Sequence, residues 1–362
     1  MMGNTPNIRF KGFTDDWEQR KLVDVVDVRS GRDYKHLEEG DIPVYGTGGY
    51  MLSVNEALSD DEDAIGIGRK GTIDNPYILR APFWTVDTLF YAVPLDKYDL
   101  NFVFDIFQNV NWKAKDESTG VPSLSKATIN AVETLMPEYA EQKKIGEYFS
   151  NLDNFITLHQ RKCDETKKLK KFMLQKMFPK KDEKKPEIRF AGFTDDWEQR
   201  KLVDVVDVRS GRDYKHLEEG DIPVYGTGGY MLSVNEALSD DEDAIGIGRK
   251  GTIDNPYILR APFWTVDTLF YAVPLDKYDL NFVFDIFQNV NWKAKDESTG
   301  VPSLSKATIN AVETLMPEYA EQKKIGEYFS NLDNFITLHQ RKCDEIKKIK
   351  KFMLQNMFPQ KG

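Results

Sequence analysis

Residues 137–179 read PEYAEQKKIGEYFSNLDNFITLHQRKCDETKKLKKFMLQKMFP, and this stretch decides the fold. One glycine interrupts it, and a mostly apolar stripe returns every three or four positions, at 145, 149, 152, 156, 159, 163, 166, 169, 173 and 177. This spacing predicts a helix of about 40 residues, roughly 60 Å long, that needs a partner helix along one face. The stretch returns at 317–359, so we expect the two helices to pair antiparallel about a pseudo-twofold axis.

The whole chain is one sequence written twice. Residues 6–178 align with residues 186–358 at an offset of 180. The five differences are Asn7/Glu187, Lys11/Ala191, Thr166/Ile346, Leu169/Ile349 and Lys176/Asn356. Because this period is far longer than that of solenoid repeats, the chain is a domain duplication and each copy is expected to fold alone. Whatever surface one copy carries, the chain carries twice.

Composition is that of a soluble globular protein of about two domains, with 362 residues, 40% of them hydrophobic and 30% charged. The net charge of −10 argues against a nucleic-acid partner, but it conceals a split. Residues 6–137 hold 14 basic and 22 acidic side chains, whereas residues 138–181 hold 11 and 6. A DNA site therefore requires basic loops that lie away from the acidic surface.

The sequence lacks a transmembrane stretch, and Met1–Phe10 lacks the apolar core of a signal peptide, so we expect a cytoplasmic protein. The cysteines are Cys163 and Cys343. His159 and Cys163 would need two ligands from the other helix, His339 and Cys343, to hold a metal. A small buried cysteine and a register-setting histidine are the favoured alternative, so no metal is expected.

Each copy divides into a mixed α/β part and the long helix. Residues 8–28 predict an extended piece and an amphipathic helix that begins at Thr14 or Asp15 and carries an apolar stripe. The β-rich runs and one further helix then follow at 42–45, 64–68, 83–86, 89–93 and 101–112.

Three loops in each copy are candidates for ligand contact. Gly66–Gly71 matches G-x-G-x-x-G, but Thr72–Pro76 cannot open the helix that a dinucleotide site needs. A tight turn that presents Arg69 and Lys70 to phosphate is the better interpretation, with a plain solvated hairpin tip as the alternative. The second loop, Tyr45–Tyr50, is rich in glycine and flanked by aromatic residues, and the third, Lys113–Lys126, is rich in lysine and hydroxyl groups.

The sequence contains no recognisable catalytic set. Asn75-Pro76-Tyr77 lacks the second proline of the amino-methyltransferase signature, and no S-adenosylmethionine-binding glycine loop accompanies it. No serine or cysteine lies in a nucleophile elbow, and no carboxylate pair stands out from an acidic surface. The chain is therefore expected to be a binding protein and not an enzyme.

The order of these parts resembles the specificity (S) subunit of type I restriction-modification enzymes. The resemblance is carried by RFxGFxxxWExRKL from Arg9, GRKGT from Gly68, STGVPSL from Ser118, and MPEYAEQKKI from Met136, and it covers nearly the whole chain twice. It implies target recognition domains at 1–136 and 186–316, spacer helices at 137–178 and 317–362, and a linker at 179–185. The implied fold is α+β: two mixed α/β domains separated by two long antiparallel helices.

The resemblance implies double-stranded DNA, two methyltransferase (M) subunits and restriction (R) subunits as partners. The cofactor, S-adenosylmethionine, is expected in the M subunits and not in this chain. Because the two domains are the same, the predicted target is a half-site, a spacer and the inverted half-site, with adenine as the methylated base. The alternative is a cytosolic scaffold that presents two identical ligand-binding domains on a coiled coil.

The residues expected at the DNA fall into three groups. We expect phosphate contacts from Arg69, Lys70, Lys113 and Lys115. We expect base contacts from Tyr45, Thr47, Tyr50, Thr72, Trp84 and Thr85. The hydroxyl groups expected against the phosphate backbone are those of Ser118, Thr119, Ser123 and Ser125. The second copy supplies Tyr225, Thr227, Tyr230, Arg249, Lys250, Thr252, Trp264, Thr265, Lys293, Lys295, Ser298, Thr299, Ser303 and Ser305.

Overall fold

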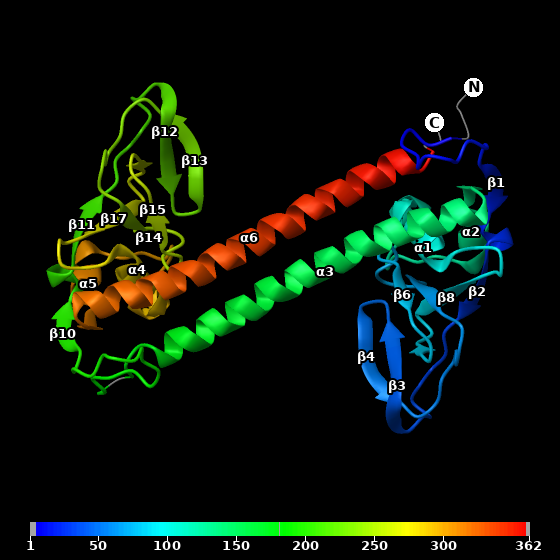
Figure 1. Cartoon of the computed structure of the whole chain (residues 1–362), viewed down its shortest axis with the longest axis horizontal. Coiled ribbons are helices and arrows are strands. Elements are labelled where there is room, and N and C mark those ends of the chain that lie inside the picture. The colour runs from blue at the N-terminus through cyan, green and yellow to red at the C-terminus, as the bar shows by residue number, and fades with distance from the viewer. Residues whose placement is uncertain (1–4, 181, 360–362) are drawn as a thin grey trace. The chain divides into compact units, whose positions relative to one another are not determined.

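The computed structural model describes residues 5–180 and 182–359, which divide into two compact units (Figure 1). Unit 1 comprises residues 1–160 and 341–362, and unit 2 comprises residues 161–340. Each unit therefore contains the globular part of one copy, the first half of the long helix of that copy and the last part of the long helix of the other copy.

The elements of the first copy follow one another without strict alternation of helices and strands. They are β1 (Glu18–Lys21), the 3-10 helix η1 (Leu22–Asp24), β2 (Val26–Ser30), β3 (Glu39–Gly46), β4 (Gly49–Val54), β5 (Ala64–Gly68), β6 (Tyr77–Leu79), β7 (Trp84–Thr85), β8 (Leu89–Pro94), α1 (Leu100–Asn109), the 3-10 helix η2 (Trp112–Lys115), α2 (Lys126–Asn130), β9 (Glu133–Met136) and α3 (Tyr139–Lys176).

The second copy repeats this order. Its elements are β10 (Glu198–Lys201), η3 (Leu202–Asp204), β11 (Val206–Ser210), β12 (Glu219–Gly226), β13 (Gly229–Val234), β14 (Ala244–Gly248), β15 (Tyr257–Leu259), β16 (Trp264–Thr265), β17 (Leu269–Pro274), α4 (Leu280–Asn289), η4 (Trp292–Lys295), α5 (Lys306–Asn310), β18 (Glu313–Met316) and α6 (Tyr319–Met357). None of the helices in the described part of the chain is both long and apolar enough to cross a membrane.

Three small sheets build the globular part of unit 1. A four-stranded antiparallel sheet has the order β2-β8-β5-β6, and a three-stranded sheet has the order β4-β3-β7, in which β3 and β7 run parallel. A two-stranded antiparallel sheet joins β1 to β9. Helix α1 packs on β5 and β8, and Asp99 caps it by accepting a hydrogen bond from the Phe102 amide at 2.9 Å.

The helix predicted within residues 8–28 is wrong. Its place is taken by β1, η1 and β2, and β1 pairs along its length with β9 in the register Glu18 to Met136. Trp17 and Leu22, the apolar residues that predicted the helix, are buried as expected, but they serve the core from extended and 3-10 backbone. Pairing with a strand over 110 residues later in the sequence outweighs local helical spacing.

The other predicted elements of the globular part are confirmed. Runs 42–45, 64–68, 83–86 and 89–93 overlap β3, β5, β7 and β8, and the run 101–112 overlaps α1. The sequence prediction missed β4, β6, β9 and the one-turn helix α2, which are short and lack a clear apolar period.

In each unit the two long-helix segments lie antiparallel, as predicted. In unit 1 the Sγ of Cys343 is 3.9 Å from the carbonyl of Ile156, and further along α6 the ammonium of Lys350 is 2.5 Å from Asp153. As the residue number rises on α6, that of its neighbour on α3 falls. Unit 2 repeats the pattern with Cys163 opposite Ile336 at 3.8 Å and Lys170 opposite Asp333 at 2.6 Å.

The compact units do not coincide with the copies, because each core takes in the helix end of the other copy, and the independent folding of each copy stays a prediction. The core of unit 1 includes Met357 and Phe358 from the end of α6, and the core of unit 2 includes Met177 and Phe178 from the end of α3. The stripe that predicted a helix partner thus continues into a domain core at the last turn of each long helix.

Candidate nucleic-acid interface

The structure brings the three predicted loops of each copy together. In unit 1 the amide of Gly71 donates to the carbonyl of Pro122 at 2.8 Å, and the amide of Leu124 donates to the carbonyl of Arg69 at 3.0 Å. On the other side of the turn, the hydroxyl of Thr47 lies 3.7 Å from the place that a Cβ at Gly71 would occupy. The turn after β5 therefore lies between the β3–β4 hairpin tip and the Lys113–Lys126 loop.

The turn after β5 depends on two glycines. A Cβ at Gly68 would lie 1.9 Å from the carbonyl oxygen of Thr72, and Gly71 has a φ of +100°. Residues 69–76 contain no helix, so the G-x-G-x-x-G match is a tight turn, as predicted, and not the start of a dinucleotide site. Arg69 and Lys70 are both exposed at this turn.

Three basic side chains help to line a hollow of about 540 Å³ beside this turn. Its lining includes Arg69, Lys70, Phe90 and Lys126. The guanidinium of Arg69 lies 5.6 Å from the centre of the Phe90 ring and donates to the carbonyl of Asp87 at 3.4 Å, so packing restricts its direction. Such an arrangement presents fixed positive charge and donors, which suits phosphate and base-edge oxygens.

Asp116 closes the Lys113–Lys126 loop. One of its carboxylate oxygens accepts hydrogen bonds from the amides of Ser123 and Ser118, each at 2.9 Å. These two bonds, that from Ser123 first, hold the pKa of Asp116 below its usual range. Ser125 donates to Glu117 at 2.9 Å and accepts from the amide of Thr128 at 3.1 Å, so its hydroxyl caps α2.

The β3–β4 hairpin presents an aromatic surface next to the turn. Tyr50 is 63% exposed and lies edge-on to Tyr45, with ring centres 6.3 Å apart. The hydroxyl of Tyr77 donates to the carbonyl of Gly46 at 2.5 Å and thereby holds the hairpin tip. Burial raises the pKa of Tyr77 above its usual range, so this phenol remains a neutral donor.

Two of the predicted DNA contacts are wrong. Trp84 is 4% exposed and Thr85 is 0% exposed, because β7 lies inside the domain. The indole nitrogen of Trp84 donates to the carbonyl of Arg32 at 3.0 Å. The same correction applies to Trp264 and Thr265, at 4% and 0%. The aromatic and hydroxyl side chains of this strand support the domain and cannot touch a duplex.

The remaining predicted residues differ in how far they are exposed. Tyr45 and Ser123 are half-buried, and Thr72 and Thr119 are exposed. Lys113 is exposed and pairs with Asp74 at 2.8 Å.

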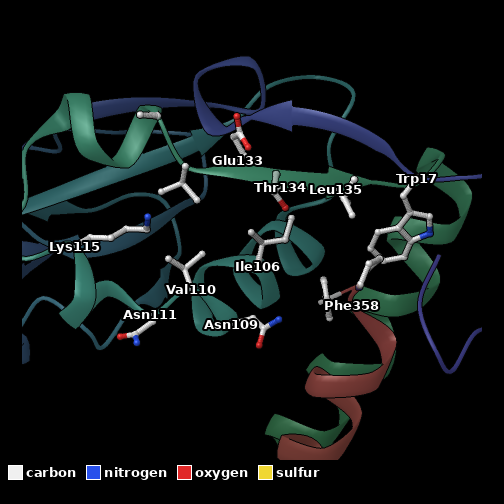
Figure 2. Close-up of a pocket in the computed structure, with 13 residues that line it drawn as sticks. Trp17, Ile106, Asn109, Val110, Asn111, Lys115, Glu133, Thr134, Leu135 and Phe358 are labelled. Atoms are coloured by element: carbon white, nitrogen blue, oxygen red, sulfur yellow. The ribbon is translucent and has the colours of Figure 1, made fainter. Parts of the chain in front are cut away.

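Lys115 and Ser118 do not line the basic hollow. Lys115 lines a different hollow of about 590 Å³, with Asn111 beside it and the rings of Trp17 and Phe358 at the other end (Figure 2). The Ser118 hydroxyl is buried without a hydrogen-bond partner among the described residues.

Among the residues that line the basic hollow, sequence reasoning missed Ser30, Leu124, Lys126 and Phe90. Lys126 is the first residue of α2 and its nearest acid, Asp27, is 4.0 Å away. Ser125 before it has the residue type of a helix N-cap, and that signal would have indicated a short helix whose first side chain faces the loop. Phe90 gave no signal, since it belongs to a strand whose residues are all apolar up to Val93.

The described residues contain no group of three or more His, Cys, Asp or Glu side chains able to hold a metal ion. Cys163 and Cys343 are buried. Each thiol lies near a main-chain carbonyl of the neighbouring helix, at 3.8 Å and 3.9 Å, and each thus occupies the place of a small buried side chain.

Unit 2 repeats the loop arrangement. Gly251 donates to the carbonyl of Pro302 at 2.8 Å, Leu304 donates to that of Arg249 at 3.0 Å, and the Arg249 guanidinium lies 5.7 Å from the centre of the Phe270 ring. The chain therefore carries the same candidate surface in both units.

Comparison with known proteins identifies relatives of these units. The family model described as the type I restriction modification DNA specificity domain matches residues 14–168 and again residues 194–348. The chain is 25% identical over 281 residues to the type I restriction enzyme MjaVIII specificity subunit of Methanocaldococcus jannaschii, a match that covers 66% of this chain and 64% of that protein. It is also 23% identical over 281 residues to the putative MjaX specificity subunit of the same organism, covering 68% and 62%.

The chain thus spans under two thirds of the length of these two relatives. Its fold is similar to the crystal structure of the type I restriction-modification system S subunit from M. genitalium, with a TM-score of 0.81, 17% identity, and coverage of 99% of this chain and 100% of that one. Since both copies match the family model over most of their length, the chain belongs to the family of type I restriction-modification DNA specificity proteins.

Proposed function

We propose that this chain is the DNA-recognition subunit of a type I restriction-modification enzyme. It binds a bipartite target through one recognition domain in each unit. The observation that carries this is the meeting of the three loops, of which the turn after β5 and the Lys113–Lys126 loop line the basic hollow. Lys70 and Lys126 supply phosphate contacts, and Arg69, held by Phe90, is placed for either phosphate or base contact.

The two half-sites are the same sequence in inverted orientation. Their identity rests on the sequence, because residues 12–165 and 192–345 do not differ. Their inversion rests on the antiparallel pairing of the long-helix segments within each unit. Two recognition surfaces that are the same in sequence and local structure read the same bases.

In this proposal the chain recognises the DNA and partner subunits supply the catalysis. Methyl transfer to adenine belongs to M subunits, which bring S-adenosylmethionine, and cleavage belongs to R subunits. The long helices offer M subunits a surface, since Phe155 is 53% exposed and Leu158 44% exposed in unit 1, and Phe335 and Leu338 of unit 2 are 54% and 50% exposed. The scaffold alternative has no support in the comparisons.

Selection from random duplexes tests the function. The chain, assembled with a cognate M subunit, is incubated with duplexes that contain two randomised segments separated by spacers of varied length, and bound DNA is sequenced. We expect one half-site and its inverted complement at a single spacing. Two unrelated half-sites would contradict the identity of the domains, and no enrichment would contradict DNA recognition itself.

A further inference from the structure

Two of the five differences between the copies meet at the junction where a long helix ends against a globular part. In unit 2 the amide of Ile188 donates to the carbonyl of Lys176 at 2.9 Å, and in unit 1 the amide of Ile8 donates to the carbonyl of Asn356 at 2.9 Å. These bonds place position 187 beside position 176, and position 7 beside position 356. The remaining three differences have no contact that explains them.

The two junctions differ in charge in a matched way. The ammonium of Lys176 lies 2.6 Å from both carboxylate oxygens of Glu187, and Lys180 adds a contact at 3.1 Å. In unit 1 both members of the pair are neutral, since Asn356 stands for the lysine and Asn7 for the glutamate. The acid and the base thus occur together at one junction and are both absent from the other.

Each junction joins two different copies. Phe178, at the end of the first copy's helix, stacks on Phe282 of the second copy with ring centres 5.4 Å apart at 18°. Phe358, at the end of the second copy's helix, stacks on Phe102 of the first copy at 5.4 Å and 24°. The domain of each copy accepts a helix end, and each copy also supplies one. Each copy can therefore pair with the other kind of copy or with a second molecule of its own kind.

We propose that the helix end and the core that receives it form an assembly surface for a second copy-length chain, and that Lys176 and Glu187 direct which copies pair. A mixed pair of first and second copies keeps the Lys176–Glu187 ion pair. A pair of two first copies places Lys176 against Asn7, and a pair of two second copies places Glu187 against Asn356, so both like pairs lose it.

The size of the preference follows from exposure. The side chains of Lys176 and Glu187 are 27% and 47% exposed, so water and salt weaken their attraction. Without any preference, mixed pairs, pairs of first copies and pairs of second copies would form in the ratio 2:1:1. We expect the share of mixed pairs relative to like pairs to exceed this by about two- to fivefold at low salt. The excess should disappear at about 1 M salt, where the screening length falls to about 3 Å.

Cutting the full chain at its linker tests this proposal. A protease site is inserted after Lys180, which is exposed, so that each copy keeps its helix and its domain. After cleavage we expect the two halves to remain together on size exclusion, because each still fills the other's core. Native mass spectrometry after equilibration then counts mixed and like pairs, which differ in mass. Halves that separate into monomers at micromolar concentration would overturn the proposal.

Two variants of the same cut chain isolate the charge. In the variant with Lys176→Asn and Glu187→Asn both junctions are neutral, and the ratio should return to 2:1:1. The matched control is Asp196→Asn, which removes the exposed ion pair with Lys185 at 3.3 Å inside the second copy and should leave the excess unchanged. A statistical ratio in the unmodified cut chain, or an excess that survives in the neutral variant, would refute the role of the pair.

Discussion

Phe358→Ala tests whether the end of α6 completes the core of unit 1. The ring is 6% exposed, stacks on Phe102 at 5.4 Å and lies edge-on to Trp17 at 5.9 Å. Removing a buried phenylalanine ring costs about 3–5 kcal/mol of unfolding free energy. Because Phe358 also lines the hollow beside Trp17, water can enter the space, and we expect a loss near the lower end, about 3 kcal/mol.

Calorimetry is the appropriate assay, because residues 12–165 and 192–345 yield identical peptides that hydrogen-exchange mass spectrometry cannot assign to a unit. Phe358→Ala should lower the midpoint of unit 1 by about 6–12 °C, given a change of 2–4 °C per kcal/mol for units of this size, and leave a second transition for unit 2. Phe178→Ala is the matched control and should lower the midpoint of unit 2 instead. A Phe358→Ala chain that unfolds at the wild-type midpoint would refute the role of the helix end.

Three further predictions concern the interface and a buried acid. Joint Lys70→Ala and Lys250→Ala changes should reduce the slope of log affinity against log salt by about two, one for each lost phosphate contact; an altered target sequence with an unchanged slope would make these lysines base readers. Trp84→Phe should lower thermal stability without changing the selected sequence, and a changed half-site would contradict its burial.

Burial raises the pKa of Asp105 well above its usual range despite nearby Lys350, so the charged carboxylate is disfavoured in the folded chain. Below about pH 3.9 the carboxyl is protonated in both the folded and the unfolded chain, and its burial carries no charge penalty. The free energy of unfolding then falls as pH rises from there through the raised pKa of the folded chain. Asp105→Asn should gain stability relative to wild type between pH 5 and pH 8 in urea unfolding, and a constant difference would contradict this.

The sequence predicted the central strands and the long helices because their signals are local. Ala64–Gly68 and Leu89–Val93 are apolar runs bounded by turn residues, and the long stripe runs from residue 145 to residue 177, about nine helical turns. The helix prediction for residues 8–28 was wrong because its signal is not decisive locally. The spacing of Trp17 and Leu22 fits either a helix face or a strand followed by a turn. Only the distant partner strand, Glu133–Met136, decides between them, and a single sequence does not show that pairing.

Glycines in the sequence predict the turn at the candidate site correctly, whereas residue type alone wrongly predicts that Trp84 and Thr85 are accessible. Gly68 and Gly71 indicated a turn because few other residues tolerate its geometry, and the structure has that turn. Trp84 and Thr85 have side chains typical of base contacts, but the same residue types are common in buried strands. Burial is a property of the assembled sheet, and the sequence around β7 carries no alternation that would reveal it.

The long stripe also shows the limit of periodicity as evidence. A repeat of three and four residues indicates that one face of a helix is covered, whatever covers it. In α3 the same stripe meets the other long helix at Cys163 and a domain core at Met173, with no change of period between them. The sequence repeat and the compact unit therefore differ, because each copy gives the end of its long helix to the core of the other. A chain break between residues 178 and 186 leaves both copies intact but separates the two chains that build each core.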